Sequence, residues 1–389
     1  MIKLLRRYNW FAFLFMLALM IVGICFVYSA NFTRESVKLQ MLYRSQAQLA
    51  LLGVVLGFAL AFLDYRRWLK FSWVFYGGSL LLLVAVLVVG TSQMGAKRWV
   101  FGIQPAELAK LSTIMLLATF LGRADARRDL LDFAAAVGIT ALPAGLIFLQ
   151  PDLGTALVFL PILAVMLFMS GTAPKALLTT VLVGVLSVTV VLGSIVLEEK
   201  PSTPAPVRKV CHAATCFLGD YQKGRLLDFV FPDRDPINRG WNRRQSQIAI
   251  GSGGRWGKGF LKGDQNILGY LPQQVSANDF IFSVLAEEKG FAGSVFVLLC
   301  FGGLLLSILT AAAIAQDGPG RLLCVGVSAM LFCHVFVNIA MTVGMVPVTG
   351  LPLPFMSYGR TFMLAVTIAM GLVQSVSVHA RAESVTGFE

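Results

Sequence analysis

The stretch that decides the fold is Trp10–Tyr28, WFAFLFMLALMIVGICFVY, which contains no charged residue. An α-helix needs roughly 20 apolar residues to cross the hydrocarbon core of a bilayer. Similar runs recur along the chain, so that 57% of the 389 residues are hydrophobic and only 13% are charged. A soluble domain has about 25% charged residues. The sequence therefore predicts an all-α, polytopic membrane protein, with residues 1–389 forming a single integral membrane domain.

We expect about ten transmembrane helices from the apolar runs. The first follows a basic start, but its core is too long for a signal peptide and no small-residue cleavage site follows it, so it is expected to be retained. The ten expected spans are Trp10–Tyr28, Gln46–Leu63, Trp73–Gly90, Ala106–Leu121, Leu131–Leu149, Thr155–Ser170, Leu177–Leu197, Phe280–Leu309, Leu322–Val346 and Phe355–Val378.

The short loops predict the orientation, because lysine and arginine accumulate on the cytoplasmic side of a membrane. With the N-terminus inside, the cytoplasmic segments contain Lys3, Arg6, Arg7, Arg66, Arg67, Lys70, Arg123, Arg127, Arg128, Lys175, Arg321 and Arg381. The opposite short loops contain only Arg34, Lys38, Arg44, Lys97 and Arg98. Both termini are then cytoplasmic, and the long loop of residues 198–279, between the seventh and eighth spans, is extracytoplasmic. It has too few large apolar residues to form a separate core.

The net charge of +12 does not indicate a nucleic-acid partner. Cytoplasmic cations follow from the topology, and the remaining cations face anionic lipid head groups on the outer side. Among the cysteines, Cys211 and Cys216 stand out because they lie in the outer loop, where a disulfide is stable. His212 between them also leaves open a metal site, which would lack further ligands.

Polar clusters interrupt the apolar runs on the side assigned as outer. Lys97 and Arg98 precede Gln104-Pro105-Ala106-Glu107, and Pro105 is suited to begin a helix. Glu107 and Lys110 then lie three residues apart on one helical face and can pair. Ionisable residues within a membrane helix indicate function, and the alternative is an ion pair that only orients two helices.

Two further clusters have a structural and a functional interpretation. Asp152, in Pro151-Asp152-Leu153-Gly154-Thr155, can cap the sixth span or take part in catalysis. Gly251-Ser252-Gly253-Gly254 with Lys258 is similar to a phosphate-binding loop, whose backbone N–H groups face anionic oxygens. The glycines alone are a weak signal, because the spacing of a nucleotide P-loop is absent.

The last two clusters lie at the ends of spans. Asp279 is a lone acid directly before the apolar run that begins at Phe280. The segment Pro347–Arg360 contains three prolines, so its backbone must be irregular near the membrane. Irregular backbone at that depth persists only where it is buried in protein or lines a wet cavity.

Together these residues fit transfer from a lipid-linked pyrophosphate. The leaving group needs cations, and the attacking hydroxyl needs one positioned base. The histidines His212, His334 and His379 are far apart in sequence and do not suggest a metal cluster. These residues alone do not separate a transferase from a lipid transporter.

The same motifs, in the same order, resemble those of the SEDS family, the shape, elongation, division and sporulation proteins. The resemblance rests on Gln104–Glu107, Pro151–Thr155, Ile248–Gly259, Asp279–Phe282 and Pro347–Gly359. Residues 256–261 and 283–288 are closer to the RodA branch, which serves elongation and cell shape, than to the FtsW branch. The resemblance implies a ten-helix glycosyltransferase of the bacterial inner membrane that polymerises lipid II beside a class B penicillin-binding protein.

The resemblance also implies roles for individual residues. The essential acid of the family matches Asp279, which would take the proton from the acceptor's 4-hydroxyl in a single inversion. The family's outer charged pair matches Glu107 and Lys110. The expected cations that would neutralise the pyrophosphate, with or without a divalent cation (Mg or Mn), are Lys97, Arg98, Lys110 and Lys258. Asp152 and Ser357 are the other expected substrate contacts.

Three features depart from the family pattern. Residues 271–279 are two residues longer than usual and have Gln273 and Asn278 in place of Glu and Thr. The second departure is the pair of cysteines in the outer loop, Cys211 and Cys216. The third, Arg360, follows Ser357-Tyr358-Gly359 where a small residue is usual. We expect Arg360 to line the cavity and to bind the pyrophosphate or a carboxylate such as Asp152. The alternative is a side chain that reaches the lipid head groups.

Two functions of different classes follow. The first is the polymerising enzyme. The second is a lipid II flippase, or a non-catalytic scaffold that recruits the penicillin-binding protein. A transporter of known type often has internal repeats with broken helices near the bilayer midplane. No internal repeat is evident and the unusual charges lie on one side, which favours the enzyme.

Overall fold

The computed structural model describes residues 2–33, 36–93, 96–100, 102–123, 129–172, 174–200, 203–215, 219–231, 239–271 and 276–380. Almost all of its regular structure is helical, as expected for a chain whose backbone must be satisfied inside a membrane. The helices are α1 (Ile2–Leu5), α2 (Trp10–Asn31), α3 (Val37–Gln40), α4 (Leu42–Phe62), α5 (Tyr65–Lys70), α6 (Ser72–Val89), α7 (Pro105–Leu121), α8 (Leu130–Leu149), α9 (Leu153–Met169), α10 (Pro174–Glu199), α11 (Ala205–Thr215), α12 (Asp220–Val230), α13 (Arg239–Ser252), α14 (Asp264–Ile267), α15 (Ile281–Ile314), α16 (Gly318–Thr342) and α17 (Arg360–His379).

Within the described residues, eight helices are long and apolar enough to cross a membrane: α2, α4, α6, α8, α10, α15, α16 and α17. The all-α, multi-pass membrane fold is therefore confirmed. Helices α7 and α9 have 17 residues each, and both pack among the long helices. The expected count of ten requires that these two also cross.

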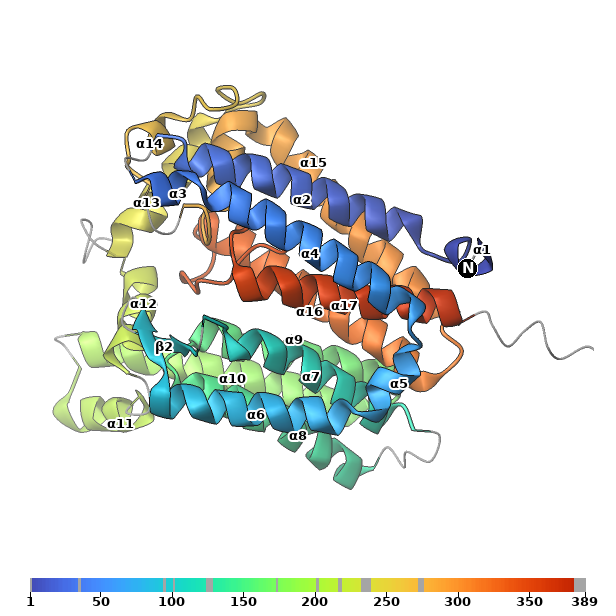
Figure 1. The fold of residues 1–389 in the computed structure, drawn as a ribbon. Helices are drawn as coiled ribbons and strands as arrows, with labels where there is room; N and C mark the ends of the chain where they lie inside the picture. The colour runs from blue at the N-terminus through green and yellow to red at the C-terminus, as the bar shows by residue number, and fades with distance from the viewer. Residues whose placement is uncertain are drawn as a thin grey trace, which may run out of the picture.

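The long helices form two groups that lie side by side in Figure 1. One group contains α2, α4, α15 and α17, and the other contains α6, α7, α8, α9 and α10. Helix α16 joins them because it packs against α15 and α17 as well as α7 and α9. The most apolar part of α17 is 89% buried, whereas that of α10 is 12% buried. Helix α7, which carries Glu107 and Lys110, packs against both α16 and α17 in the interior of the molecule.

Helix α15 is broken by Gly290, whose φ is 65°. The break frees main-chain groups, and residues 254–259 satisfy them: Phe291 N donates to Gly254 O, and Lys258 N donates to Glu287 O. Gly257 allows this contact, since a Cβ on it would lie 2.2 Å from Glu288 O. Phosphate binding by Gly251–Gly254 stays a prediction. Gly253 and Gly257 let the loop pack against the broken helix, since a Cβ on Gly253 would lie 2.0 Å from Ala286 O.

Two segments differ from the expected spans for local reasons. Residues 343–359, which contain the prolines, form no regular helix, so the ninth span ends at Thr342 and the tenth begins at Arg360. The described part of the long loop forms four helices, α11, α12, α13 and α14. The described residues also contain an antiparallel pair, β1 (Thr91–Gln93) and β2 (Ala96–Trp99), and an isolated bridge between Val100 and Ile103.

Candidate active site

Asp279 lies just before α15, at the end of the bundle where α7, α9, α15 and α17 begin; we call this the site end. The backbone around Asp279 is fixed by Asn338 of α16, which is fully buried. Its Nδ2 donates to Asp279 O at 3.0 Å and to Leu351 O at 2.7 Å. The carboxylate faces Gly350, where a Cβ would lie 3.5 Å from Oδ2. The irregular proline-rich segment therefore forms one wall around the acid.

Arg225 of α12 lies beside the acid, and the sequence did not reveal it. Its Nη1 donates to Thr349 O at 2.8 Å and lies 3.6 Å from the Cβ position of Gly350. The guanidinium and the Asp279 carboxylate thus approach the same glycine. No spacing links Arg225 to Asp279 along the chain, and α12 has the composition of an ordinary charged loop segment. Only the packing of the long loop brings the two together.

The environment of Asp279 raises the pKa of its carboxyl from 3.8 to about 6. Burial is the largest cause and raises the pKa; the positive charges of Arg225 and Arg98 lower it, and the negative charge of Asp152 raises it. A carboxyl with this pKa is mainly ionised at neutral pH yet binds a proton readily, which suits a general base.

Arg98 and Asp152 form a second charged pair at the site end. Arg98 Nη1 lies 3.6 Å from Asp152 Oδ2, and its Nη2 donates to Pro151 O at 2.8 Å. The other carboxylate oxygen of Asp152 accepts from Thr155 N at 3.2 Å, so the predicted cap of α9 is confirmed. Asp152 thus pairs with Arg98, and the expectation that it pairs with Arg360 is wrong.

Glu107 and Lys110 form the predicted ion pair, with Nζ and Oε2 2.7 Å apart. Both side chains are almost fully buried. Lys110 Nζ also lies 2.7 Å from Nε2 of His334 on α16. The ammonium therefore faces two protein partners in the interior. A direct contact between Lys110 and a pyrophosphate, which the sequence suggested, does not fit this arrangement.

The side chains of Ser357 and Lys258 bind other groups of the protein and are not open to a substrate. Ser357 is buried; its Oγ donates to Asn278 O at 2.5 Å and accepts from Leu353 N at 2.8 Å. Lys258 Nζ lies 2.7 Å from Glu287 Oε1 and 3.0 Å from Asp264 Oδ2. Burial lowers the pKa of Lys258, but its hydrogen bonds to the two carboxylates raise this pKa by more. The pKa of Lys258 is therefore raised overall. Both residues hold the site's framework, so the expected substrate contacts are not supported.

Arg360 is the first residue of α17 and is exposed at the site end. Its Nε donates to Tyr358 Oη at 3.3 Å, and no carboxylate within the described ranges forms an ion pair with it. The next residue, Thr361, accepts from the main-chain N of Gln104, which caps α7. Arg360 therefore lies where α7 and α17 begin, and its guanidinium can meet a ligand.

Three predicted residues fall at or beyond the edge of what the structure describes. Lys97 lies in β2 opposite Ser92, but its side chain is outside the described part. Cys211 is buried in α11, and Cys216 lies outside the described residues. Cys211 is a free thiol, so the predicted disulfide is not formed in this structure, whereas the metal alternative stays a prediction. His212 hydrogen-bonds through Nδ1 to Glu198 Oε1 at 2.7 Å.

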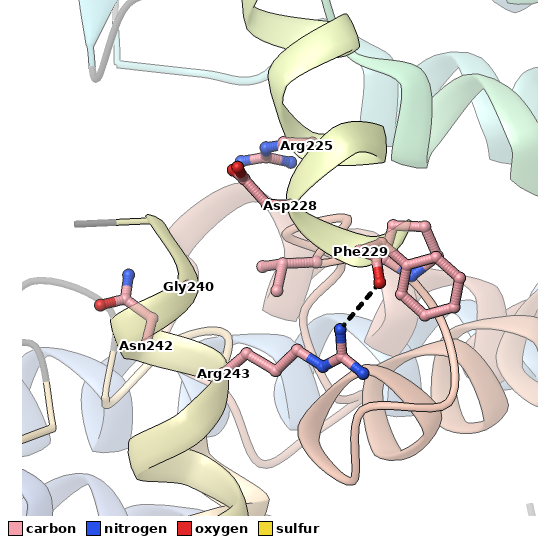
Figure 2. Close-up of a pocket in the computed structure, with 8 residues that line it drawn as sticks. Arg225, Asp228, Phe229, Gly240, Asn242 and Arg243 are labelled. Atoms are coloured by element: carbon pink, nitrogen blue, oxygen red, sulfur yellow. Dashed lines mark hydrogen bonds between the residues drawn. The ribbon is translucent and has the colours of Figure 1, made fainter. Parts of the chain in front are cut away.

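A pocket of about 150 Å³ opens beside Arg225, between α12, α13 and the start of the proline-rich segment. Figure 2 shows Arg225 and Asp228 on α12 facing Asn242 and Arg243 on α13. Arg243 is fixed, since it donates to Phe229 O at 3.2 Å and to Gly344 O at 2.7 Å. Arg225 thus lies between this pocket and Asp279.

The structure therefore defines a class: a multi-pass α-helical membrane protein with a partly buried acid, Asp279, and several arginines at the end of its helix bundle. A family model described as "Cell cycle protein" (FtsW, RodA, SpoVE) matches residues 9–382. The chain belongs to this family.

Named relatives cover nearly the whole chain. The peptidoglycan glycosyltransferase RodA of Treponema pallidum is 34% identical, over 96% of this chain and 98% of its own length. The peptidoglycan glycosyltransferase MrdB of Escherichia coli K12 is 33% identical, over 95% of this chain and 93% of its own length. A chain of a solved peptidoglycan synthase complex superimposes with a TM-score of 0.74 at 31% identity, covering 97% of this chain and 99% of the other.

Proposed function

We propose that this protein is a peptidoglycan glycosyltransferase that polymerises lipid II into glycan strands during elongation and shape maintenance. The relatives that carry the activity in their names span almost the entire chain. The observation that carries the mechanism is Asp279, a carboxyl with a pKa of about 6, beside Arg225 at the site end.

The proposed reaction is a single displacement. The 4-hydroxyl oxygen of the acceptor sugar bonds to the anomeric carbon of the donor, and Asp279 takes the hydroxyl proton. The bond between that carbon and the pyrophosphate oxygen breaks, and the electron pair leaves with the lipid pyrophosphate. This leaving group needs charge neutralisation. The exposed Arg360 is suited to supply it, in place of Lys110 and Lys258, while Arg225 and Arg98 set the charge around Asp279.

A divalent cation could share this neutralisation. The described residues contain no group of three His, Cys, Asp or Glu side chains suited to hold a metal. Mg²⁺ commonly binds through one or two carboxylates together with substrate phosphates, so Asp279 and Asp152 would fit only a cation brought largely by the pyrophosphate. Titration of the purified enzyme with EDTA and then Mg²⁺ measures this requirement.

The proposed partner is a class B penicillin-binding protein. The similarity to a chain of a peptidoglycan synthase complex supports a role within such an assembly. Co-purification with the cognate transpeptidase tests the pairing: a stable complex that raises the polymerisation rate is expected, and the absence of both effects would argue against it.

The decisive experiment is polymerisation of labelled lipid II by the purified protein, alone and with its partner. Asp279→Asn keeps the size and hydrogen bonding of the side chain but removes the base. Loss of a general base typically lowers the rate by about 10²–10⁴-fold, and the variant should still fold and bind its partner. Polymerisation by Asp279→Asn at the parental rate would refute the assignment.

A further inference from the structure

A continuous series of contacts runs from α7 to the wall around Asp279. It starts at Glu107, whose Oε2 lies 2.7 Å from Lys110 Nζ. The ammonium lies 2.7 Å from His334 Nε2, and His334 Nδ1 lies 3.1 Å from the main-chain oxygen of Pro352. Lys110 and His334 both have 0% exposure. No solvent therefore competes for these contacts.

The contacts define the protonation of His334. An ammonium has donors only, so Nε2 must accept from Lys110 and carry no proton. A carbonyl oxygen only accepts, so Nδ1 must carry the proton and donate to Pro352. His334 is therefore neutral, with its proton on Nδ1. The ring is also held in place by Phe362 of α17, which stacks on it with centroids 4.7 Å apart.

The carbonyl that His334 binds belongs to the wall beside the acid. Pro352 follows Gly350 by two residues, and a Cβ on Gly350 would lie 3.5 Å from Asp279 Oδ2. Asn338, one turn further along α16, donates to the oxygens of Leu351 and Asp279. Helix α16 thus uses two side chains, four residues apart, to hold consecutive carbonyls of the irregular segment.

This segment depends on such donors. It contains Pro347, Pro352 and Pro354, so it cannot form the hydrogen bonds of a helix. An unsatisfied carbonyl at membrane depth is costly. The side chain that satisfies it also determines where the segment lies, and therefore where Gly350 and the neighbouring Thr349–Arg225 contact lie relative to Asp279.

We infer that His334 is a positioning residue for the glycosyl transfer, which links the Glu107–Lys110 pair to the backbone beside Asp279. The inference rests on the proposed function of Asp279 as the base. It gives the buried ion pair a role at a distance: Lys110 orients His334, and His334 orients Pro352. Small displacements matter, since a shift of about 1 Å in a reacting group can cost roughly 10²-fold in rate.

The test uses three substitutions that separate the two contacts. His334→Phe keeps the stacking with Phe362 and removes both hydrogen bonds. His334→Asn places an amide N–H near the position of Nδ1, so it can still bind Pro352. His334→Gln places an amide oxygen near the position of Nε2, so it can still accept from Lys110. The kcat and KM for lipid II are measured with each purified full-length variant and its partner.

We expect kcat to fall on the order of tenfold in His334→Phe and His334→Gln, with KM within about twofold because the ring does not contact substrate. His334→Asn should retain more of kcat than His334→Gln. The acid limb of the kcat–pH profile, set by Asp279 with Arg225, Arg98 and Asp152 around it, should also move in His334→Phe. A loss of folded protein alone would lower the measured rate by the same factor at every pH and would not move this acid limb.

Gln374→Leu is the matched control. Gln374 is also buried and binds the backbone of another element, Asn9, but it lies towards the far end of α17. Its kcat per folded protein should stay parental. A parental kcat and pH profile in His334→Phe would overturn the inference, as would His334→Gln equalling or exceeding His334→Asn. Asp279→Asn assayed in parallel separates the failures: if it is inactive while His334→Phe is parental, only the role of His334 is refuted.

Discussion

At the scale of single residues, the site combines two acids, Asp279 and Asp152, with arginines that differ in how firmly they are held. Arg225 and Arg98 are fixed by carbonyl oxygens, of Thr349 and Pro151 respectively. Arg360 is exposed and contacts only the Tyr358 hydroxyl among the described partners. This difference suggests that Arg225 and Arg98 set the charge around Asp279, while Arg360 remains available for the substrate.

Arg225→Gln should change the pH dependence of polymerisation. A general base acts when deprotonated, so the rate rises as the pH passes the pKa of Asp279, about 6. Arg225 lowers this pKa, and its removal raises it further, which moves the acid limb to higher pH. With a change of about one pKa unit, the rate falls about fivefold at pH 6 and hardly at pH 8. An unchanged limb would show that Arg225 does not act on the acid.

Arg360→Gly restores the residue usual in the family. A charge-assisted hydrogen bond contributes roughly 1.5–3 kcal/mol, so loss of pyrophosphate binding should raise the apparent KM for lipid II at least about tenfold. Arg360→Lys keeps the charge, so its apparent KM should lie between those of the parent and Arg360→Gly. If the side chain only reaches lipid head groups, the kinetic constants of both variants stay parental, and the binding role is excluded.

At the scale of elements, the Gly-rich segment after α13 packs against the break in α15. Glu287 and Glu288, just before Gly290, are both buried. Glu287 accepts from Lys258 Nζ, and Glu288 accepts from Leu261 N at 3.1 Å. The segment is therefore part of the scaffold that places the N-terminal part of α15, and with it Asp279.

Gly257→Ala should destabilise this contact. Its φ is +79°, and a Cβ would meet the backbone of Glu288 at 2.2 Å, which no side-chain movement can relieve. We expect a loss on the order of 3 kcal/mol, seen as a lower melting temperature in detergent. Gly251→Ala is the control, because Gly251 is helical and has open space around it, and alanine there should be neutral or slightly stabilising. Equal melting temperatures for Gly257→Ala and the parent would contradict this packing argument.

At the scale of the whole molecule, the proposed function requires the site end to face outwards and both termini to lie in the cytoplasm. The charge of the short loops supports this orientation. Helix α5, with Arg67, lies at the opposite end of the bundle in Figure 1 from the start of α9.

Labelling with a membrane-impermeant maleimide tests the orientation. In a variant without the native cysteines, Arg360→Cys should react in intact spheroplasts, and Arg67→Cys should react only after the membrane is opened. The reverse pattern would place the site in the cytoplasm and exclude polymerisation on the outer side.

The sequence by itself determined the features that depend on local order. Apolar runs of sufficient length specify membrane helices, since the bilayer imposes both length and composition. The Glu107–Lys110 pair follows from helical spacing, and the cap by Asp152 follows from its place before α9. The family motifs also identified Asp279 before any geometry was known.

Only the tertiary structure decided which polar groups remain open to a substrate. Three contacts join residues that are far apart in sequence. Arg225 lies beside the wall around Asp279, His334 contacts Lys110, and Lys258 pairs with Glu287. Such contacts depend on how the helices pack against one another. Neither the composition nor the hydrophobic periodicity of the sequence specifies this packing. A lysine near a glycine-rich loop has the same local sequence whether it binds phosphate or a buried glutamate, and the difference is made by the partner that folding brings to it.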